Sequence, residues 1–140
     1  MFVTENETNG LVFPDVPGSI VIFGLGYGVQ TLAETAWLQA KELYYWGDID
    51  THGFSILARL RTGFPQTRSF LMDRETLLAH RELWGHEKEI HEGTISRLTE
   101  AERAVLDYLR GGAFGYRIRL EQELIGFDWF RRALEVLTGS

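Results

Sequence analysis

The 140-residue sequence contains no cysteine, only 3 prolines and no long apolar run. Without thiols the chain can form neither disulfides nor thiolate zinc sites, and its composition is compatible with a reducing cytoplasm. No hydrophobic stretch reaches the length of a transmembrane helix, and residues 1–10 are more polar than a secretory signal peptide. We therefore expect a protein that does not associate with membranes.

Basic residues are also scarce, with 14 lysines and arginines against 20 aspartates and glutamates, a formal net charge of -6. This balance argues against non-specific binding of phosphate over the whole surface, whereas clustered carboxylates suit hard cations. Any contact with nucleic acid should be local or assisted by another part of a larger assembly. The length and the 44% hydrophobic content predict one soluble globular domain over residues 1–140.

The most informative stretch is Leu43–Trp46, an unbroken apolar and aromatic run that predicts a strand buried on both faces. Asp48 and Asp50 follow it. In an extended segment, a spacing of two residues sends both carboxylates to the same side, roughly 6.5 Å apart, where one divalent cation could bridge them. Open α/β sheets bind ligands at this end of their strands.

Thr51 can cap a helix in which Phe54, Leu57 and Leu60 form the buried face. The same residues allow a second interpretation, because Asp, Thr and Gly after a strand also make an ordinary turn with a helix cap. Short acidic motifs have many false positives, so spacing alone leaves both interpretations open.

The rest of the chain alternates strands with helices, which predicts an α/β fold with a mostly parallel sheet covered on both sides. Further strands are expected at Phe2–Asn6, Ser19–Phe23 and Arg68–Met72. Helices are expected at Thr31–Leu43, Arg74–Trp84, Thr99–Arg110 and Gly126–Leu137, and in the third of these Thr99 and Glu102 form a capping box before Gly111 and Gly112 end it. A strand that starts at residue 2 is unusual at a natural terminus, so we expect more chain before Met1.

Two motifs resemble known sites without matching them. Gly24, Gly26 and Gly28 follow a strand as in a dinucleotide fingerprint, but residue 29 is valine where that fingerprint has Gly or Ala, and a tight turn explains the glycines equally well. His86, Glu87 and His91 resemble a zinc-protease motif, in which two histidines four residues apart share one face of a helix. Here the histidines are five residues apart and lie on different faces. We interpret them, with Glu89 and Glu92, as a solvated charged face.

A second charged group lies near the C-terminus, where Arg117 and Arg119 precede Glu121 and Glu123. In an extended segment the two glutamates share one side, and so do the two arginines. This pattern fits either a second acidic pair flanked by phosphate-binding arginines or an exposed row of ion pairs.

The acidic motifs and the strand order together resemble the Toprim domain, the metal-binding catalytic domain of topoisomerases, primases and several nucleases. Gly47–Leu57, which reads Gly-Asp-Ile-Asp-Thr-His-Gly-Phe-Ser-Ile-Leu, is similar to the Toprim segment in the C-terminal part of JetD, the nuclease subunit of Wadjet plasmid-defence systems. It is more loosely similar to the A subunit of type IIB topoisomerases. The likeness to JetD continues at Thr4–Asn9, Leu71–Asp73, Leu98–Glu102 and Arg119–Glu123.

This resemblance implies a Toprim-like Rossmannoid three-layer sandwich with about four strands. It implies Glu5, Asp48 and Asp50 as ligands of Mg²⁺ or Mn²⁺, with Glu121 and Glu123 contributing to a second ion. It further implies cleavage of double-stranded DNA in the bacterial cytoplasm, SMC-like Wadjet subunits as partners, and a homodimer of the full-length protein. The chain lacks the N-terminal part of JetD, so we expect weak or undetectable nuclease activity from these 140 residues alone.

Several residues have roles that the sequence leaves open. The resemblance assigns no tyrosine here as covalent nucleophile, so we expect water to fill that role. His52 is a candidate proton shuttle or phosphate contact, with a solvent-facing turn histidine as the alternative. Arg59, Arg61 and Arg119 are candidate contacts to the DNA backbone, or ordinary surface arginines. A degenerate Toprim module that serves in binding or assembly, and a nucleotide-binding domain that uses Gly24–Gly28, remain alternative functions.

Overall fold

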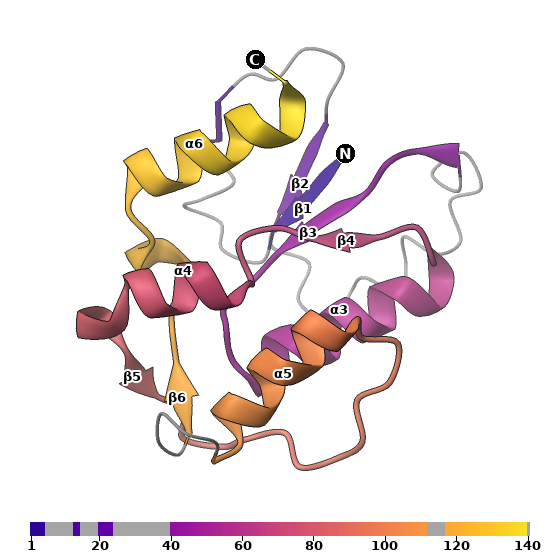
Figure 1. The fold of residues 1–140 in the computed structure, drawn as a ribbon. Coiled ribbons are helices and arrows are strands. Elements are labelled where there is room, and N and C mark those ends of the chain that lie inside the picture. The colour runs from indigo at the N-terminus through magenta and orange to yellow at the C-terminus, as the bar shows by residue number, and fades with distance from the viewer. Residues whose placement is uncertain (5–12, 15–19, 24–39, 112–116, 140) are drawn as a thin grey trace.

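A four-stranded parallel sheet forms the centre of the molecule (Figure 1). The computed structural model describes residues 1–4, 13–14, 20–23, 40–111 and 117–139. The strand order is β2-β1-β3-β4, and each neighbouring pair is parallel. The strands are β1 (Phe2–Thr4), β2 (Val21–Phe23), β3 (Tyr44–Trp46) and β4 (Arg68–Ser69).

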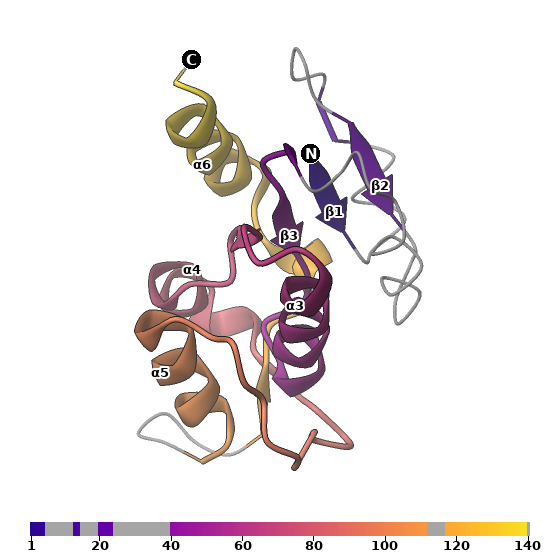
Figure 2. The same ribbon diagram turned by 90° about the vertical axis from the view of Figure 1, so that its right-hand side faces the viewer.

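Helices flank the sheet on both sides, as expected for an α/β three-layer sandwich (Figures 1 and 2). On one face the ring of Phe130 in α6 (Phe127–Thr138) stacks on Trp46, with 4.9 Å between ring centroids. The other side carries α3 (Thr51–Gly63), whose Phe54, Leu57 and Leu60 are almost completely buried. The predicted buried face of this helix is therefore confirmed.

The remaining elements extend the molecule away from β1 and β2 (Figure 2). A contact between side chains joins α4 (Arg74–Ala79) to α5 (Glu100–Leu109), because the guanidinium of Arg74 lies 5.6 Å from the ring centre of Tyr108. The short strands β5 and β6 pair antiparallel. The bounds are α4 (Arg74–Ala79), η3 (Arg81–Leu83), β5 (Gly85–His86), α5 (Glu100–Leu109), β6 (Ile118–Arg119) and η4 (Gln122–Leu124), where η marks a 3-10 helix.

The central strand and the two C-terminal helices agree with the sequence predictions, and the capping box of Thr99 and Glu102 is present. Two elements are shorter than predicted. The fourth strand ends at Ser69, because Leu71 has φ 58 and an extended strand cannot continue through it. The helix predicted to reach Trp84 ends at Ala79 and gives way to η3, after which Trp84 has an extended backbone.

Several predictions fall on residues outside the described ranges. These include the helix at Thr31–Leu43 over most of its length, the glycines at 24–28, and the ends of the first two strands. Among the described residues, no helix combines the length and the hydropathy needed to cross a membrane.

Candidate active site

The candidate site lies where the chain leaves β3 and meets the segment after β6. Ile49 and Leu120 form an antiparallel bridge with two backbone hydrogen bonds of 2.9 and 3.1 Å. Both side chains are completely buried in the core. Because side chains alternate along extended backbone, the residues on either side of this bridge point away from the core and toward one another. Two distant acidic and basic motifs of the sequence therefore meet here.

Arg119 connects the two aspartates. Its Nη2 donates to Oδ2 of Asp48 at 3.0 Å, and its Nε lies 3.1 Å from Oδ2 of Asp50. The side chain of Asp50 is only 5% exposed, whereas those of Asp48 and Arg119 are 22% and 35% exposed. One cationic group thus bridges both carboxylates, on the side where the sequence predicts a bridging cation.

The second oxygen of each aspartate accepts a hydrogen bond from the backbone. Oδ1 of Asp48 accepts from the N–H of Gln122 at 2.7 Å, and Oδ1 of Asp50 accepts from the N–H of Gly53 at 2.6 Å. Asp50 is therefore the N-cap of α3, and the prediction that Thr51 caps this helix is wrong. The two Oδ2 atoms are left as the oxygens that face the cation.

The close approach of α3 to Asp48 depends on glycine at position 53. A Cβ atom there would lie 2.1 Å from the backbone oxygen of Asp48 and 3.2 Å from Oδ1 of Asp50. Real Cβ atoms do not come this near to backbone oxygen, so any larger residue would push the helix away from the acidic pair.

Glu87 is a site residue that the sequence analysis missed. His86, Glu89 and Glu92 are exposed as expected, but Glu87 is 4% exposed. Its Oε1 accepts hydrogen bonds from the hydroxyl of Thr51 at 2.6 Å and from the N–H of Thr51 at 3.2 Å, and its Oε2 accepts from the N–H of His52 at 3.3 Å. No local signal predicts this, because the contacts join residues that are 36 and 35 positions apart.

Gln122 was also missed. It is completely buried, its N–H holds Asp48, and its side-chain amide donates to the hydroxyl of Thr4 at the end of β1. Since Thr4 lies opposite Trp46 in the sheet, this glutamine connects the carboxyl ends of two neighbouring strands. Glu5, the third predicted metal ligand, lies outside the described residues.

The charges around Asp50 change its proton affinity. The pKa of Asp50 is raised to about 7, and burial is the largest cause. The charges of Glu87 and Asp48 also raise this pKa, whereas the Gly53 N–H and Arg119 lower it. Burial alone would lower the pKa of Arg119, but its hydrogen bond to Asp48 and the acidic charges around it raise this pKa overall. The guanidinium therefore stays charged.

Glu121 and Glu123 lie at the outer rim of the site. Glu121 Oε1 is 3.9 Å from Nη1 of Arg119. The pKa of Glu121 is raised, mainly by a hydrogen bond with Glu123 and to a smaller extent by burial. The prediction of one extended segment through both glutamates is wrong beyond Glu121, because residues 122–124 form η4. The two side chains nevertheless interact.

The other predicted phosphate contacts have different surroundings. His52 is in the first turn of α3 with a 44% exposed side chain, and its Nε2 lies 2.8 Å from the carbonyl oxygen of Glu89. Arg59 is exposed further along α3. Arg61 is not a candidate, because it is buried and its Nη2 donates to Glu102 Oε2 at 2.9 Å. The interpretation of Arg61 as a surface or DNA-contacting arginine is therefore wrong.

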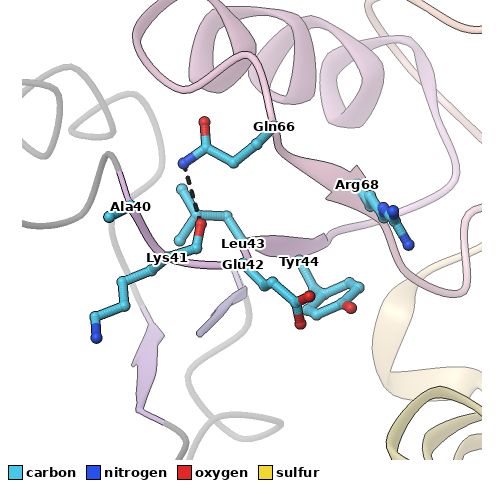
Figure 3. A pocket seen from close by; sticks show the side chains of 7 residues that line it. All are labelled: Ala40, Lys41, Glu42, Leu43, Tyr44, Gln66 and Arg68. Carbon is cyan, nitrogen blue, oxygen red and sulfur yellow. Dashed lines mark hydrogen bonds between the residues drawn. The ribbon is translucent and has the colours of Figure 1, made fainter.

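Cavities among the described residues lie away from the acidic pair, and two of them border the central sheet. One of about 260 Å³ is at the amino end of β3, where the Gln66 amide donates to the Lys41 carbonyl at 3.1 Å (Figure 3). Another of about 590 Å³ lies between β4, the start of α4 and α5. Neither of these two cavities is lined by Asp48 or Asp50.

The donor set agrees with a hard divalent cation, although it is small. Within the described ranges no group of three or more His, Cys, Asp or Glu residues could hold a metal ion. Mg²⁺, however, is often bound by only one or two carboxylates, together with waters and substrate phosphates. Asp48 Oδ2 and Asp50 Oδ2, which both face the guanidinium of Arg119, provide these two carboxylate ligands.

The fold and this edge define an α/β domain whose parallel sheet carries an acidic pair at its carboxyl end. The chain belongs to the family described as Wadjet protein JetD, C-terminal, whose model matches residues 1–134. It is therefore a component of a Wadjet defence system, and the resemblance to JetD is confirmed. No curated protein matches the chain.

Proposed function

We propose that this chain is the catalytic domain of a metal-dependent endonuclease that cleaves double-stranded DNA within a Wadjet system. The observation that carries the proposal is the convergence of Asp48 Oδ2 and Asp50 Oδ2 on one cationic group at the carboxyl edge of the sheet. Membership of the JetD C-terminal family supports it, and so does the resemblance of the acidic residues in the sequence to the Toprim pattern.

In this proposal Asp48 and Asp50 hold Mg²⁺ or Mn²⁺ through their Oδ2 atoms. Glu5 is the third ligand. It follows Thr4 in sequence, and Thr4 pairs with Trp46, which comes two residues before Asp48. Glu121 and Glu123 contribute to a second ion at the rim. Ions held by these residues would supply charge neutralisation on the phosphate and assistance to the attacking and leaving oxygens.

The protein groups around the acidic pair orient the substrate. Arg119 lies at the same edge and can contact phosphate oxygens with its planar guanidinium. The N–H groups of Thr51, His52 and Gly53 are already bonded to Glu87 and Asp50, so the start of α3 does not offer them to phosphate. The His52 side chain is 44% exposed at this helix end and is the candidate phosphate contact there. Water is the nucleophile.

Plasmid cleavage tests the assignment directly. The double variant Asp48→Asn/Asp50→Asn in the complete protein keeps the size of both side chains and leaves an N-cap oxygen at position 50. We expect its cleavage rate with Mg²⁺ or Mn²⁺ to fall by more than about 100-fold, the scale of losing one key electrostatic group.

The matched control is Asp107→Asn/Asp128→Asn, which removes the same charge from two exposed helix residues. This control should cut at the wild-type rate. Undiminished cutting by the Asp48 and Asp50 variant, with unchanged folding, would remove the nuclease assignment.

One observation favours a second function, a Toprim-like module without catalysis that serves in binding or assembly. Arg119 already lies against both carboxylates and offsets part of their negative charge, so the described part of the site holds a positive group without an ion. A melting-temperature titration with MnCl₂ separates the two functions, because a ligand that binds the folded state raises the melting temperature. The non-catalytic module predicts no shift. The nucleotide-binding alternative depends on glycines outside the described residues and stays a prediction.

A further inference from the structure

Arg119 occupies the position that a shared ion would need. Its Nη2 and Nε lie within 3.1 Å of the two Oδ2 atoms, and the Oδ1 atoms are held by backbone N–H groups of Gln122 and Gly53. A bridging cation and the guanidinium therefore compete for the same two oxygens. They also repel each other electrostatically, so binding of one at these oxygens disfavours the other.

We propose that Arg119 is an internal counter-ion of the acidic pair, which a divalent cation replaces at the two Oδ2 atoms. The inference rests on the proposed function, since it assumes that Asp48 and Asp50 are metal ligands. In the ion-free protein, Arg119 lies between two acidic side chains, of which Asp50 is only 5% exposed, and offsets part of their mutual repulsion. It thereby positions the carboxylates before the metal arrives.

The surroundings of Arg119 allow it to leave. Its side chain is 35% exposed, and its Nη1 already lies 3.9 Å from Oε1 of Glu121, which is 41% exposed on the rim. A rotation of the side chain toward Glu121 removes the guanidinium from the Oδ2 atoms and keeps it near an opposite charge. In that outer position it can receive a phosphate oxygen. Metal binding and exposure of the phosphate-binding arginine are therefore one coupled event.

Calorimetric titration of the 140-residue chain with MnCl₂ tests the exchange. Arg119→Gln removes the competing charge but leaves an amide that can hydrogen-bond, and we expect it to bind Mn²⁺ about tenfold more tightly than wild type. Arg119→Lys keeps a charge without the planar fork and should give a smaller increase.

Removing any arginine makes the chain more negative and attracts cations, so a control with the same charge change is needed. Arg131→Gln on α6 serves this purpose, because the Arg131 side chain is 56% exposed and its ion pairs are with Asp128 and Glu135 of the same helix. It should bind Mn²⁺ with wild-type affinity. Asp48→Asn/Asp50→Asn should not bind at this site.

A second readout follows the metal titration in the wild-type chain itself. The Nε–H signal of Arg119 in a ¹⁵N NMR spectrum, identified by its loss in Arg119→Lys, should move as MgCl₂ is added and follow the binding curve. An arginine with a purely structural role would keep its signal unchanged.

The outcomes separate the two proposals. If the Asp48 and Asp50 variant loses Mn²⁺ binding while Arg119→Gln binds as wild type or more weakly, the exchange is refuted and the proposed metal site stands. An unmoved Arg119 signal at saturating Mg²⁺ also refutes the exchange. If neither wild type nor Arg119→Gln binds Mn²⁺, both the exchange and the metal-dependent function fail.

Discussion

Asp50 shows at the level of one residue why the acidic motif has two valid interpretations. One carboxylate oxygen caps α3 through Gly53, and the other faces the cationic side of the site. The sequence analysis weighed a helix cap against a metal ligand, and the structure gives the cap to Asp50 in place of Thr51. In the proposed function Asp50 is both the cap of α3 and a metal ligand, which would tie the position of the helix to the geometry of the site.

Gly53 makes that connection testable. We expect Gly53→Ala to lower the free energy of unfolding by about 1–3 kcal/mol, because its Cβ would lie 2.1 Å from the backbone oxygen of Asp48. Chemical denaturation of the purified chain measures the change. Gly85→Ala is the control, since a Cβ there meets nothing within 4 Å, and it should change stability by less than about 0.5 kcal/mol. Equal effects of the two substitutions would contradict the close packing of α3 on Asp48.

At the level of elements, the sequence predicted those helices and strands whose signals lie within a few neighbouring residues. The buried run at β3, the apolar face of α3 and the capping box of α5 each have a periodicity or a cap that the sequence contains within a few residues. The roles of Glu87 and Gln122 at the site were not predicted, because they depend on pairing between segments that are distant in the sequence. Glu87 reaches the start of α3 only through the β5–β6 pair, where its N–H donates to the Arg117 carbonyl at 2.9 Å.

The same reasoning explains the errors about charge. Arg61 and Glu102 both look like surface residues in sequence, yet their side chains are only 9% and 7% exposed and connect α3 to α5. Glu102 also accepts from Ser69 of β4 at 2.7 Å and completes the capping box with Thr99. One carboxylate therefore fixes three elements.

This ion pair gives the domain a defined pH dependence. Burial would raise the pKa of Glu102, but hydrogen bonds from Arg61 and Ser69 lower it overall, below its usual value of 4.5. Its stabilising effect is thus fully present above pH 4.5 and is lost as pH falls through the lowered pKa. At pH 7 we expect Glu102→Gln to cost about 3 kcal/mol, because Arg61 stays buried without its counter-ion.

Denaturation curves at several pH values check this expectation. The difference in unfolding free energy between wild type and Glu102→Gln should narrow as the pH falls through the lowered pKa of Glu102, because the wild-type carboxylate then becomes protonated. Glu100→Gln removes the same charge from an exposed position in the same helix and should cost less than about 1 kcal/mol. A difference that stays constant from pH 7 to pH 3 would show that the charge of Glu102 does not stabilise the fold.

For the whole molecule, the proposed function places opposite demands on the acidic site and on the overall charge. Carboxylates are needed to hold hard cations, but a formal net charge of -6 repels the phosphate backbone. The sequence alone indicates this conflict, because composition does not depend on the fold. A domain of this kind needs divalent ions, or basic surface supplied by other parts of its assembly, to hold DNA.

DNA binding by the 140-residue chain tests this argument. By fluorescence anisotropy with a labelled duplex, we expect the Kd at physiological salt to be weaker than about 10⁻⁴ M, the weak end of the non-specific range. Adding Mg²⁺ should strengthen binding, because it neutralises the acidic pair and, if Arg119 is displaced, exposes a guanidinium to phosphate. Asp48→Asn/Asp50→Asn should bind DNA more tightly than wild type without Mg²⁺, since two repelling charges are gone, and should lose the response to Mg²⁺. Micromolar binding by the wild-type chain without divalent ions would show that its acidic balance does not govern its contact with DNA.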